Sequence, residues 1–269
     1  MEKPSLANGD VVDLSLTLAS ELPASWPGAV PFRHFTEHWF KEESNESQIV
    51  LCNDGGPYRS HLMILDEHSG THFDAPAHFV PPSRSGLPNA SHFGDVSGEV
   101  VPLDQFRGRS RILDARHIKL SEHPGESVEV DLGRVVEWER ETRSLEGGDV
   151  VLLLTGWDKR YVRGPAGRSY VHNSIVSLTE PAWPAFTPAA MGYLADSGVR
   201  CVGTDAPSMG AAHDAAPTHL AGLGRGMVFV ECLANLDLIL DVPSIFMFAP
   251  VKVARSSGGP GRAYAVVGA

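Results

Sequence analysis

The sequence HSGTHFDAPAH, residues 68–78, places three histidines and one aspartate within eleven positions. Gly70, Thr71 and Pro76 lie inside this stretch, and all three residue types oppose a continuous helix. The segment is therefore predicted to be a turn that leads into a strand. No other part of the chain concentrates so many side chains that can bind a metal or transfer a proton.

Alternation along a strand predicts how these side chains are arranged. In extended backbone His72 and Asp74 point to the same side, and a glycine turn can bring His68 onto that side as well. Two imidazoles and a carboxylate then form a donor set that suits zinc or manganese and leaves coordination positions for water and substrate. The alternative is that they are ordinary polar residues on a loop.

Hydrophobic periodicity on both sides of this segment predicts an α/β protein. The run DVVLLLT, residues 149–155, is typical of a strand buried on both faces. Other strands are predicted at 10–18, 60–65, 111–114, 199–203, 227–231, 245–249 and 264–267, and helices at 132–143 and 188–197. With no repeat and no long linker, the prediction is a single domain over 1–269 with a mixed, strand-rich sheet.

The segment 23–40 combines three prolines with several aromatic residues. It is predicted to be an ordered loop, and its rings offer a flat apolar surface for an aromatic substrate or for a second subunit. The candidate substrate-binding residues are Trp26, Phe32, Phe35 and Trp39. Ordinary core packing of these rings is the alternative.

Composition excludes several classes of function. A net charge of −11 argues against a nucleic-acid surface, and no apolar run approaches the ~20 residues of a membrane span. The first residues, 1–13, resemble no export signal, so a cytoplasmic location is expected. Cys52, Cys201 and Cys232 are widely spaced and are expected to be buried thiols.

A second group of chemically useful residues lies in the C-terminal half of the chain. His219 precedes Glu231 by twelve residues, and Asp205 and Ser208 lie upstream. This spacing alone also fits a surface histidine and a glutamate at a strand end. His213 is a competing candidate ligand in the same region.

Residues 68–78 match the HxGTHxDxPxH signature of the cyclase family of metal-dependent hydrolases position for position. This family includes isatin hydrolase, bacterial kynurenine formamidase and cyclases of antibiotic pathways. The chain is similar to the family in further segments, at 152–157, 203–208, 219–236 and 257–263. The resemblance implies a swivelling β/β/α fold over most of the chain.

The resemblance also implies roles for particular residues. One divalent ion, zinc or manganese, is expected on His68, His72 and Asp74, with His78 beside the substrate as a catalytic proton-transfer group. In the formamidase branch Asp74 also bridges to a second ion on His219 and Glu231, so a second ion is possible here. Thr71, Asp205 and Ser208 are expected to lie around the ligands and hold them in position. Family members tend to be dimers or larger homo-oligomers.

Two features distinguish this chain within the family. Cys232 stands where the family commonly has asparagine, and a thiol is a much weaker hydrogen-bonding group than an amide. The length of the chain and its insertion at 82–106 are more similar to the isatin hydrolase and antibiotic-cyclase branches than to the formamidases.

Three functions are consistent with these observations. In the first, a bound cation lowers the pKa of water from about 15.7 toward about 7, and His78 moves the proton while an amide, lactam or lactone of a small aromatic molecule is hydrolysed. In the second, the ion polarises a ketone so that a polyketide-like chain closes a ring. The third is a non-catalytic protein that binds a metal or a ligand.

Overall fold

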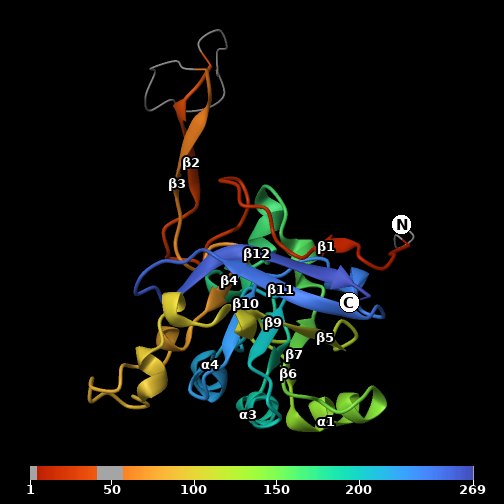
Figure 1. The fold of residues 1–269 in the computed structure, drawn as a ribbon. Helices are drawn as coiled ribbons and strands as arrows, with labels where there is room; N and C mark the ends of the chain where they lie inside the picture. Colours follow the sequence, from red (N-terminus) through yellow and green to blue (C-terminus); the bar gives the residue numbers. More distant parts are fainter. Residues whose placement is uncertain (1–4, 41–56, 269) are drawn as a thin grey trace.

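Seven strands form a closed, mixed barrel at the centre of the chain (Figure 1). The structure, a computed structural model, describes residues 5–40 and 57–268. Around the barrel the order is β12, β11, β5, β7, β9, β10, β4 and back to β12, with β1 on the outer side of β12. The strands are β1 (Val11–Asp13), β4 (His72–Asp74), β5 (Arg107–Asp114), β7 (Asp149–Leu154), β9 (Cys201–Thr204), β10 (Val228–Glu231), β11 (Ser244–Pro250) and β12 (Gly258–Val267).

The four strands β5, β7, β9 and β10 run parallel, and the other barrel pairs are antiparallel. The predicted mixed α/β sheet is thereby confirmed. The helices are α1 (Leu132–Glu141), α2 (His172–Ile175), α3 (Pro188–Asp196) and α4 (Ala216–Leu223), and short strands β6 (Glu129–Val130) and β8 (Ala185–Phe186) pair beside the barrel. Single 3₁₀ turns occupy Pro76–His78, His92–Asp95, Gly98–Val100, Leu103–Phe106, Trp157–Arg160, Pro165–Ser169 and Leu236–Leu238.

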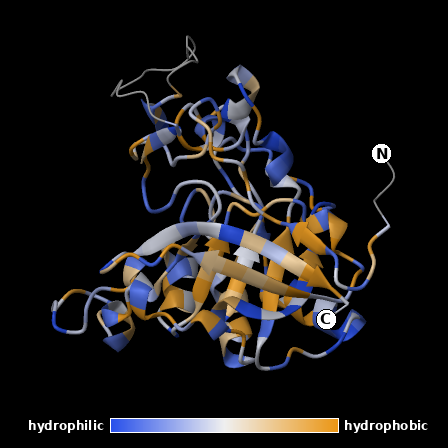
Figure 2. Ribbon diagram, turned by 45° about the horizontal axis from the view of Figure 1, so that its top comes forward, coloured by the Kyte–Doolittle hydropathy of each residue, from blue (hydrophilic) through white to orange (hydrophobic). Residues whose placement is uncertain are grey.

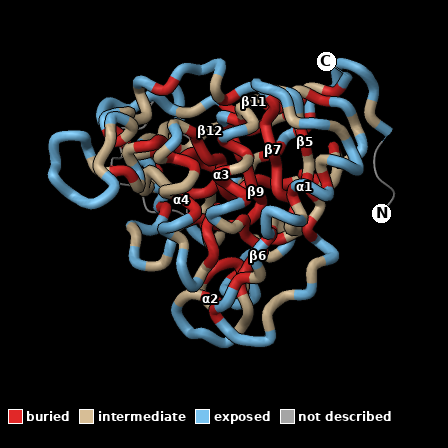
Figure 3. Tube along the Cα trace, turned by 90° about the horizontal axis from the view of Figure 1, so that it is seen from below, coloured by how far each residue is buried: buried red, intermediate tan, exposed pale blue. Residues whose placement is uncertain are grey.

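Strand β7 explains why a continuous apolar run predicts a strand at the centre of the sheet. Val150, Leu152 and Leu154 belong to the hydrophobic cluster inside the barrel, whereas Val151 and Leu153 belong to the cluster under the helices. Both faces of the strand are buried, and after Asp149, which pairs with arginines, every position on it is apolar. Figure 3 shows this buried material running through the strands and α3, with exposed chain around the rim.

Two of the helices begin at side chains that satisfy free backbone N–H groups. Asp131 accepts a hydrogen bond of 2.8 Å from the N–H of Arg134 at the start of α1. At the start of α3, Thr187 accepts one of 3.1 Å from the N–H of Ala190. Such caps stabilise a helix start by about 1 kcal/mol each, and they explain why both predicted helices begin where expected.

The segment 23–40 differs from the predicted loop. Arg33–His38 forms strand β2, which pairs with β3 (Ser60–Ile64) in a hairpin that projects away from the barrel (Figure 1). The strand predicted at 60–65 is therefore present but lies outside the barrel. The reason is that the last proline of the segment is Pro31, so the residues after it are free to extend and pair.

Strand limits were less predictable at the two ends of the chain. β1 covers only three of the residues predicted as a strand at 10–18. β12 begins six residues before the predicted 264–267, because Gly258 can approach β4 closely: a Cβ at Gly258 would lie 2.1 Å from the carbonyl oxygen of Phe73. Apolar residues gather in the barrel strands (Figure 2).

The described residues include no helix that is both long and apolar enough to cross a membrane. Cys201 and Cys232 are buried free thiols, as predicted, and Cys52 lies outside the described residues.

Phe73 offers a test of this core. Its ring packs inside the barrel, with its centroid 4.9 Å from that of Phe106 and 6.1 Å from that of Phe248. Phe73→Ala is expected to lower the free energy of unfolding by about 3–5 kcal/mol, measured by urea denaturation, because it leaves a cavity. Leu103→Ala, at a side chain that is 72% exposed, should change it by less than about 0.5 kcal/mol. Equal effects would contradict the proposed core.

Candidate metal centre

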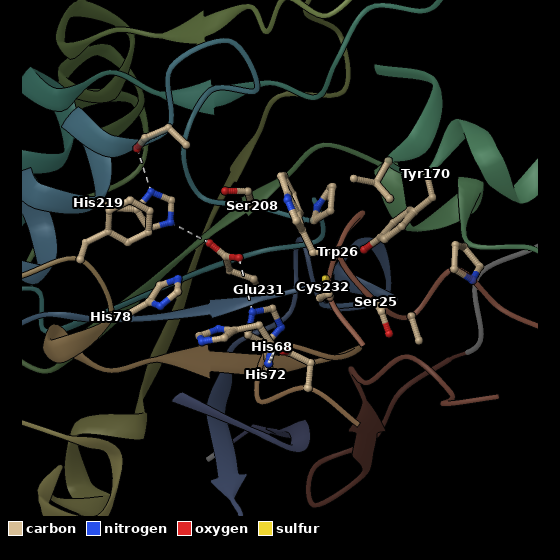
Figure 4. A pocket seen from close by; sticks show the side chains of 18 residues that line it. Ser25, Trp26, His68, His72, His78, Tyr170, Ser208, His219, Glu231 and Cys232 are labelled. Carbon is tan, nitrogen blue, oxygen red and sulfur yellow. Dashed lines mark hydrogen bonds and ion pairs between the residues drawn. The ribbon is translucent and has the colours of Figure 1, made fainter. Parts of the chain in front are cut away.

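The candidate ligands come together at the end of the barrel where β10 terminates (Figure 4). His72 and Asp74 lie on β4, Glu231 is the last residue of β10, and His219 lies on α4. Because β4 and β10 are antiparallel with His72 opposite Glu231, these two side chains share one face of the sheet. His68 arrives from the turn before β4.

That turn has the form predicted from the sequence. Gly70 adopts φ = 60°, and the N–H groups of His68 and Ser69 donate to the side-chain and backbone oxygens of Asp66 at 3.0 and 3.2 Å. A left-handed residue at this point suits glycine, because it has no Cβ. The turn brings the ring of His68 back over the strand, next to Asp74.

Asp74 occupies the middle of the group. Its Oδ1 lies 2.8 Å from Nδ1 of His68 and 3.6 Å from Nε2 of His72, and its Oδ2 lies 3.6 Å from Nε2 of His219. Glu231 approaches the same two rings from the other side, at 3.6 Å from His72 and 3.3 Å from His219. One carboxylate therefore lies between the two predicted ligand sets.

Hydrogen bonds determine which ring nitrogens face the centre. Nδ1–H of His72 donates to the carbonyl oxygen of Gly70, and Nδ1–H of His219 donates to that of Ala215, each at 2.8 Å. Metal-binding histidines usually make such a bond, because it directs the lone pair of Nε2 toward the ion. Here each Nε2 faces carboxylate oxygens, an arrangement that requires a proton or a cation between them.

The buried oxygen Oδ2 of Asp74 supports a cation at this position. It has no hydrogen-bond partner among the described residues, and the Asp74 side chain is 1% exposed. A buried carboxylate oxygen without a donor is costly, so a ligand is expected to occupy its free lone pairs. The ligand atoms of His72, Asp74 and Glu231 lie within 4.8 Å of one another, as do those of His68, Asp74 and His78.

The charges of the candidate ligands depend on one another. Burial alone would raise the pKa of Asp74, but the imidazoles of His78 and His219 hold it well below its ordinary value. Burial alone would lower the pKa of His219, yet Asp74 and Glu231 raise it to about 10. Without a metal, a proton held on His219 therefore balances the charge of the ionised Asp74. Burial alone would also lower the pKa of His68, but the hydrogen bond and the charge of Asp74 outweigh it and raise that pKa.

Two residues that the sequence analysis did not single out hold His68 in place. Nε2 of His68 lies 3.0 Å from Oγ of Ser257, which in turn donates to Glu67 at 2.8 Å. These two hydrogen bonds leave Nδ1 of His68 facing Asp74. The available signals were weak: Glu67 directly precedes His68, and Ser257 opens a glycine-rich segment.

His78 lies on the 3₁₀ turn after β4, at the edge of the cavity. Its ring stacks on that of His68, with centroids 4.0 Å apart and planes 28° apart. The ring is exposed to the cavity but enclosed by protein, and this burial, together with nearby His68 and His219, lowers its pKa below the ordinary value. At neutral pH it is therefore unprotonated and able to accept a proton.

A cavity of about 440 Å³ opens directly beside these residues. Apart from the candidate ligands, its walls are mainly apolar and aromatic, and they include Pro23, Trp26, Phe79, Tyr170 and Pro207. Of the four predicted substrate-binding rings, only Trp26 lines it. Phe32 is buried outside this cavity, and Phe35 and Trp39 do not line it, because β2 carries this part of the chain away from the barrel.

The three predicted supporting residues act at different places. Thr71 donates to the carbonyl oxygen of Cys232 at 2.6 Å, and Ser208 lines the cavity. Asp205 contacts no candidate ligand: it accepts hydrogen bonds from Thr155 and Gly156, and burial raises its pKa to about 7.

The residue that does contact the candidate ligand Glu231 is Met209, whose backbone N–H donates a hydrogen bond of 2.6 Å to its carboxylate. The competing candidate His213 accepts from the N–H of Ser127 and does not line the cavity.

Comparison with known proteins shows a consistent pattern. The sequence model of the family described as "Putative cyclase" matches residues 12–211. The isatin hydrolase of Roseibium aggregatum is 31% identical over 221 residues, which are 80% of this chain and 77% of that protein. The kynurenine formamidase of Erythrobacter litoralis is 29% identical over 252 residues, 93% and 91% of the two chains. A crystal structure of an isatin hydrolase bound to the product analogue thioisatinate matches with a TM-score of 0.74 at 23% identity, covering 95% of this chain and 91% of the other.

Metal binding should release protons. With the pKa of His219 raised to about 10, the metal-free protein holds that proton throughout pH 6–8, and an ion that uses Nε2 must displace it. The affinity for Zn²⁺ or Mn²⁺ is therefore expected to rise up to about tenfold per pH unit. Titration calorimetry in buffers of different ionisation enthalpy measures the protons released.

His219→Gln should remove about one of these protons per protein, whereas His213→Gln, outside the cavity, should change nothing. Metal binding that is independent of pH and releases no proton would contradict this description of the site.

Proposed function

The chain belongs to the Putative cyclase family, and from this premise we propose that it is a metal-dependent hydrolase of an amide, lactam or lactone bond in a small aromatic molecule. The observation that supports this most directly is the position of Asp74. It is a buried carboxylate with one unpartnered oxygen, and the imidazoles of His68, His72 and His219 that surround it line an apolar cavity.

His68, His72 and Asp74 would hold a zinc or manganese ion, and His219 and Glu231 provide for a second ion that shares Asp74. Such an ion polarises a carbonyl group and makes water acidic enough to react near neutral pH. The fixed Nδ1–H bonds of His72 and His219 keep the liganding nitrogens in position without reorganisation. The buried carboxylates balance the charge of the cation.

His78 is the proposed proton-transfer group. Because its pKa is lowered, the ring is neutral at pH 7 and can take a proton from the attacking water. Stacking on His68 holds it at the border between the ligands and the cavity. From there it can return the proton to the leaving nitrogen or oxygen of the substrate.

The rest of the cavity favours an uncharged aromatic substrate. Trp26 and Phe79 provide flat apolar surface, and Trp26 is held by an edge contact with Trp183 at 6.1 Å. Among the described residues that line the cavity there is no lysine or arginine, so no such cationic side chain lies outside the cluster of imidazoles and carboxylates. A neutral aryl lactam or amide fits this environment better than an amino acid derivative.

Ring closure is the second candidate function. The family is described by its cyclase activity, and a mainly apolar cavity also suits a folded polyketide-like chain. The same ion and His78 would then act on a ketone, and a substrate carbon would attack in place of water. The two functions differ in whether oxygen from water enters the product.

Labelled water distinguishes them. The metal-loaded protein is incubated with isatin, N-formylaniline and an aryl lactone in H₂¹⁸O, and the products are analysed by mass spectrometry. Hydrolysis is expected to place ¹⁸O in the carboxylate that forms. His78→Gln should lower kcat by roughly 10² to 10⁴ with unchanged metal content, whereas His72→Ala should lose the metal. Turnover without ¹⁸O, or equal metal loss in both variants, would contradict the proposal.

We also propose that the chains form a homodimer through the β2–β3 hairpin. Leu62, Met63 and Ile64 on β3 are 45%, 58% and 43% exposed, so both faces of this two-stranded unit are uncovered. An isolated two-stranded hairpin is marginally stable in water, and a second copy would cover its apolar side chains.

Light scattering tests this association. The wild-type chain is expected to have twice the monomer mass, and Met63→Glu should shift it toward the monomer because it places a charge in the contact. The control is Leu103→Glu. Leu103 is exposed and lies on the 3₁₀ turn Leu103–Phe106, outside the hairpin. A monomeric wild-type chain would rule out this role for the hairpin.

A further inference from the structure

Tyr170 forms part of the cavity wall on the side away from His78 (Figure 4). The residue is 1% exposed, and the edge of its ring contacts Tyr161, with centroids 5.1 Å apart. Its backbone carbonyl accepts a hydrogen bond of 2.7 Å from the indole of Trp157. The phenol is therefore held rigidly, with its hydroxyl pointing toward Cys232 and the interior of the cavity.

This hydroxyl has no hydrogen-bond partner of normal geometry among the described residues. A buried polar group without a partner is costly, and such groups in folded proteins usually serve a ligand or an ordered water. The polar group beside it is the thiol of Cys232, which is a weak donor and a weak acceptor. The weak thiol of Cys232 therefore competes poorly with a ligand oxygen for the donor of Tyr170.

The backbone at Cys232 makes this arrangement more informative. Cys232 adopts φ = 57°, a left-handed conformation in which asparagine is several-fold enriched. An amide there would be a strong partner for a neighbouring hydroxyl. Cysteine at this position offers no such competing amide.

The charges around the cavity determine which acceptor suits Tyr170. The carboxylates of Asp66 and Glu231 line the same cavity, and its described lining residues include no lysine or arginine. Away from the candidate metal ligands, an anionic substituent would find no lysine or arginine among these lining residues. A neutral oxygen, such as a ketone or an ether, accepts from a phenol without needing such a partner.

We propose that Tyr170 is a specificity-determining residue, and that its hydroxyl donates to a neutral oxygen substituent on the aromatic ring of the substrate, at the side away from the bond that is cleaved. This inference rests on the proposed function. It adds a substrate class to it: aryl lactams or amides that carry a ring ketone or ether.

The experiment compares isosteric substituents that differ in the acceptor. Isatins and unactivated oxindoles carrying a methoxy group or an ethyl group at each free ring position are used with the metal-loaded protein. The ratio of kcat/KM for methoxy over ethyl is measured for the isatins, and the ratio of Kd by calorimetry for the oxindoles. At one ring position the wild-type protein is expected to prefer methoxy by roughly 3- to 10-fold.

Tyr170→Phe should abolish this preference at unchanged metal content, and the preference should be lost in KM and Kd with little change in kcat. It should change the melting temperature little, because the hydroxyl that it removes has the weak thiol of Cys232 as its polar neighbour. Tyr161→Phe is the matched control, since its hydroxyl donates to the carbonyl oxygen of Thr17 at 2.8 Å and does not line the cavity. Cys232→Ala tests whether the thiol is the donor instead.

The preference should persist in Tyr161→Phe and Cys232→Ala. A wild-type protein that hydrolyses isatins but shows no preference at any position would overturn this inference and leave the proposed function standing. Loss of the preference in Cys232→Ala but not in Tyr170→Phe would also overturn it. Failure to hydrolyse any of the isatins, with normal oxindole selectivity, would instead contradict the proposed function alone.

Discussion

The structure depends on the burial of one carboxylate, Asp74, among imidazoles. A buried carboxylate is stable only when opposite charge or hydrogen-bond donors surround it, and the imidazoles of His68, His72 and His219 lie around this one. Glu231 adds a second negative charge within the same group. The centre is therefore complete only with a proton or a cation, and this requirement links its chemistry to its folding.

The barrel makes this arrangement by strand register. β4 has only three residues, yet it pairs with β10 on one side and with β12 on the other, and so closes the barrel. Its outer residues, His72 and Asp74, face the site, whereas Phe73 between them fills the core. Closing the barrel and assembling the site are consequently the same structural event.

The cavity shows a division between reaction and recognition. The ligands and His78 lie on one side, and the ring and hydroxyl of Tyr170 lie on the other (Figure 4). The first part is common chemistry for a metal-assisted reaction at a carbonyl group. In the second part, Cys232 leaves the hydroxyl of Tyr170 without a strong partner.

Local sequence determined the turn and strand of residues 68–78, the buried strand at 149–154 and the helices at 132–141 and 188–196, because glycine, proline and hydrophobic periodicity act within a few residues. The convergence of His219 and Glu231 on Asp74 was implied only by family resemblance, since their own spacing is uninformative. Only the tertiary structure decided that β2 leaves the barrel and removes Phe35 and Trp39 from the cavity, and that Ser257 and Tyr170 reach the site from distant segments. Such contacts depend on strand pairing across long stretches of chain, and no local pattern of residue types encodes which strands will pair.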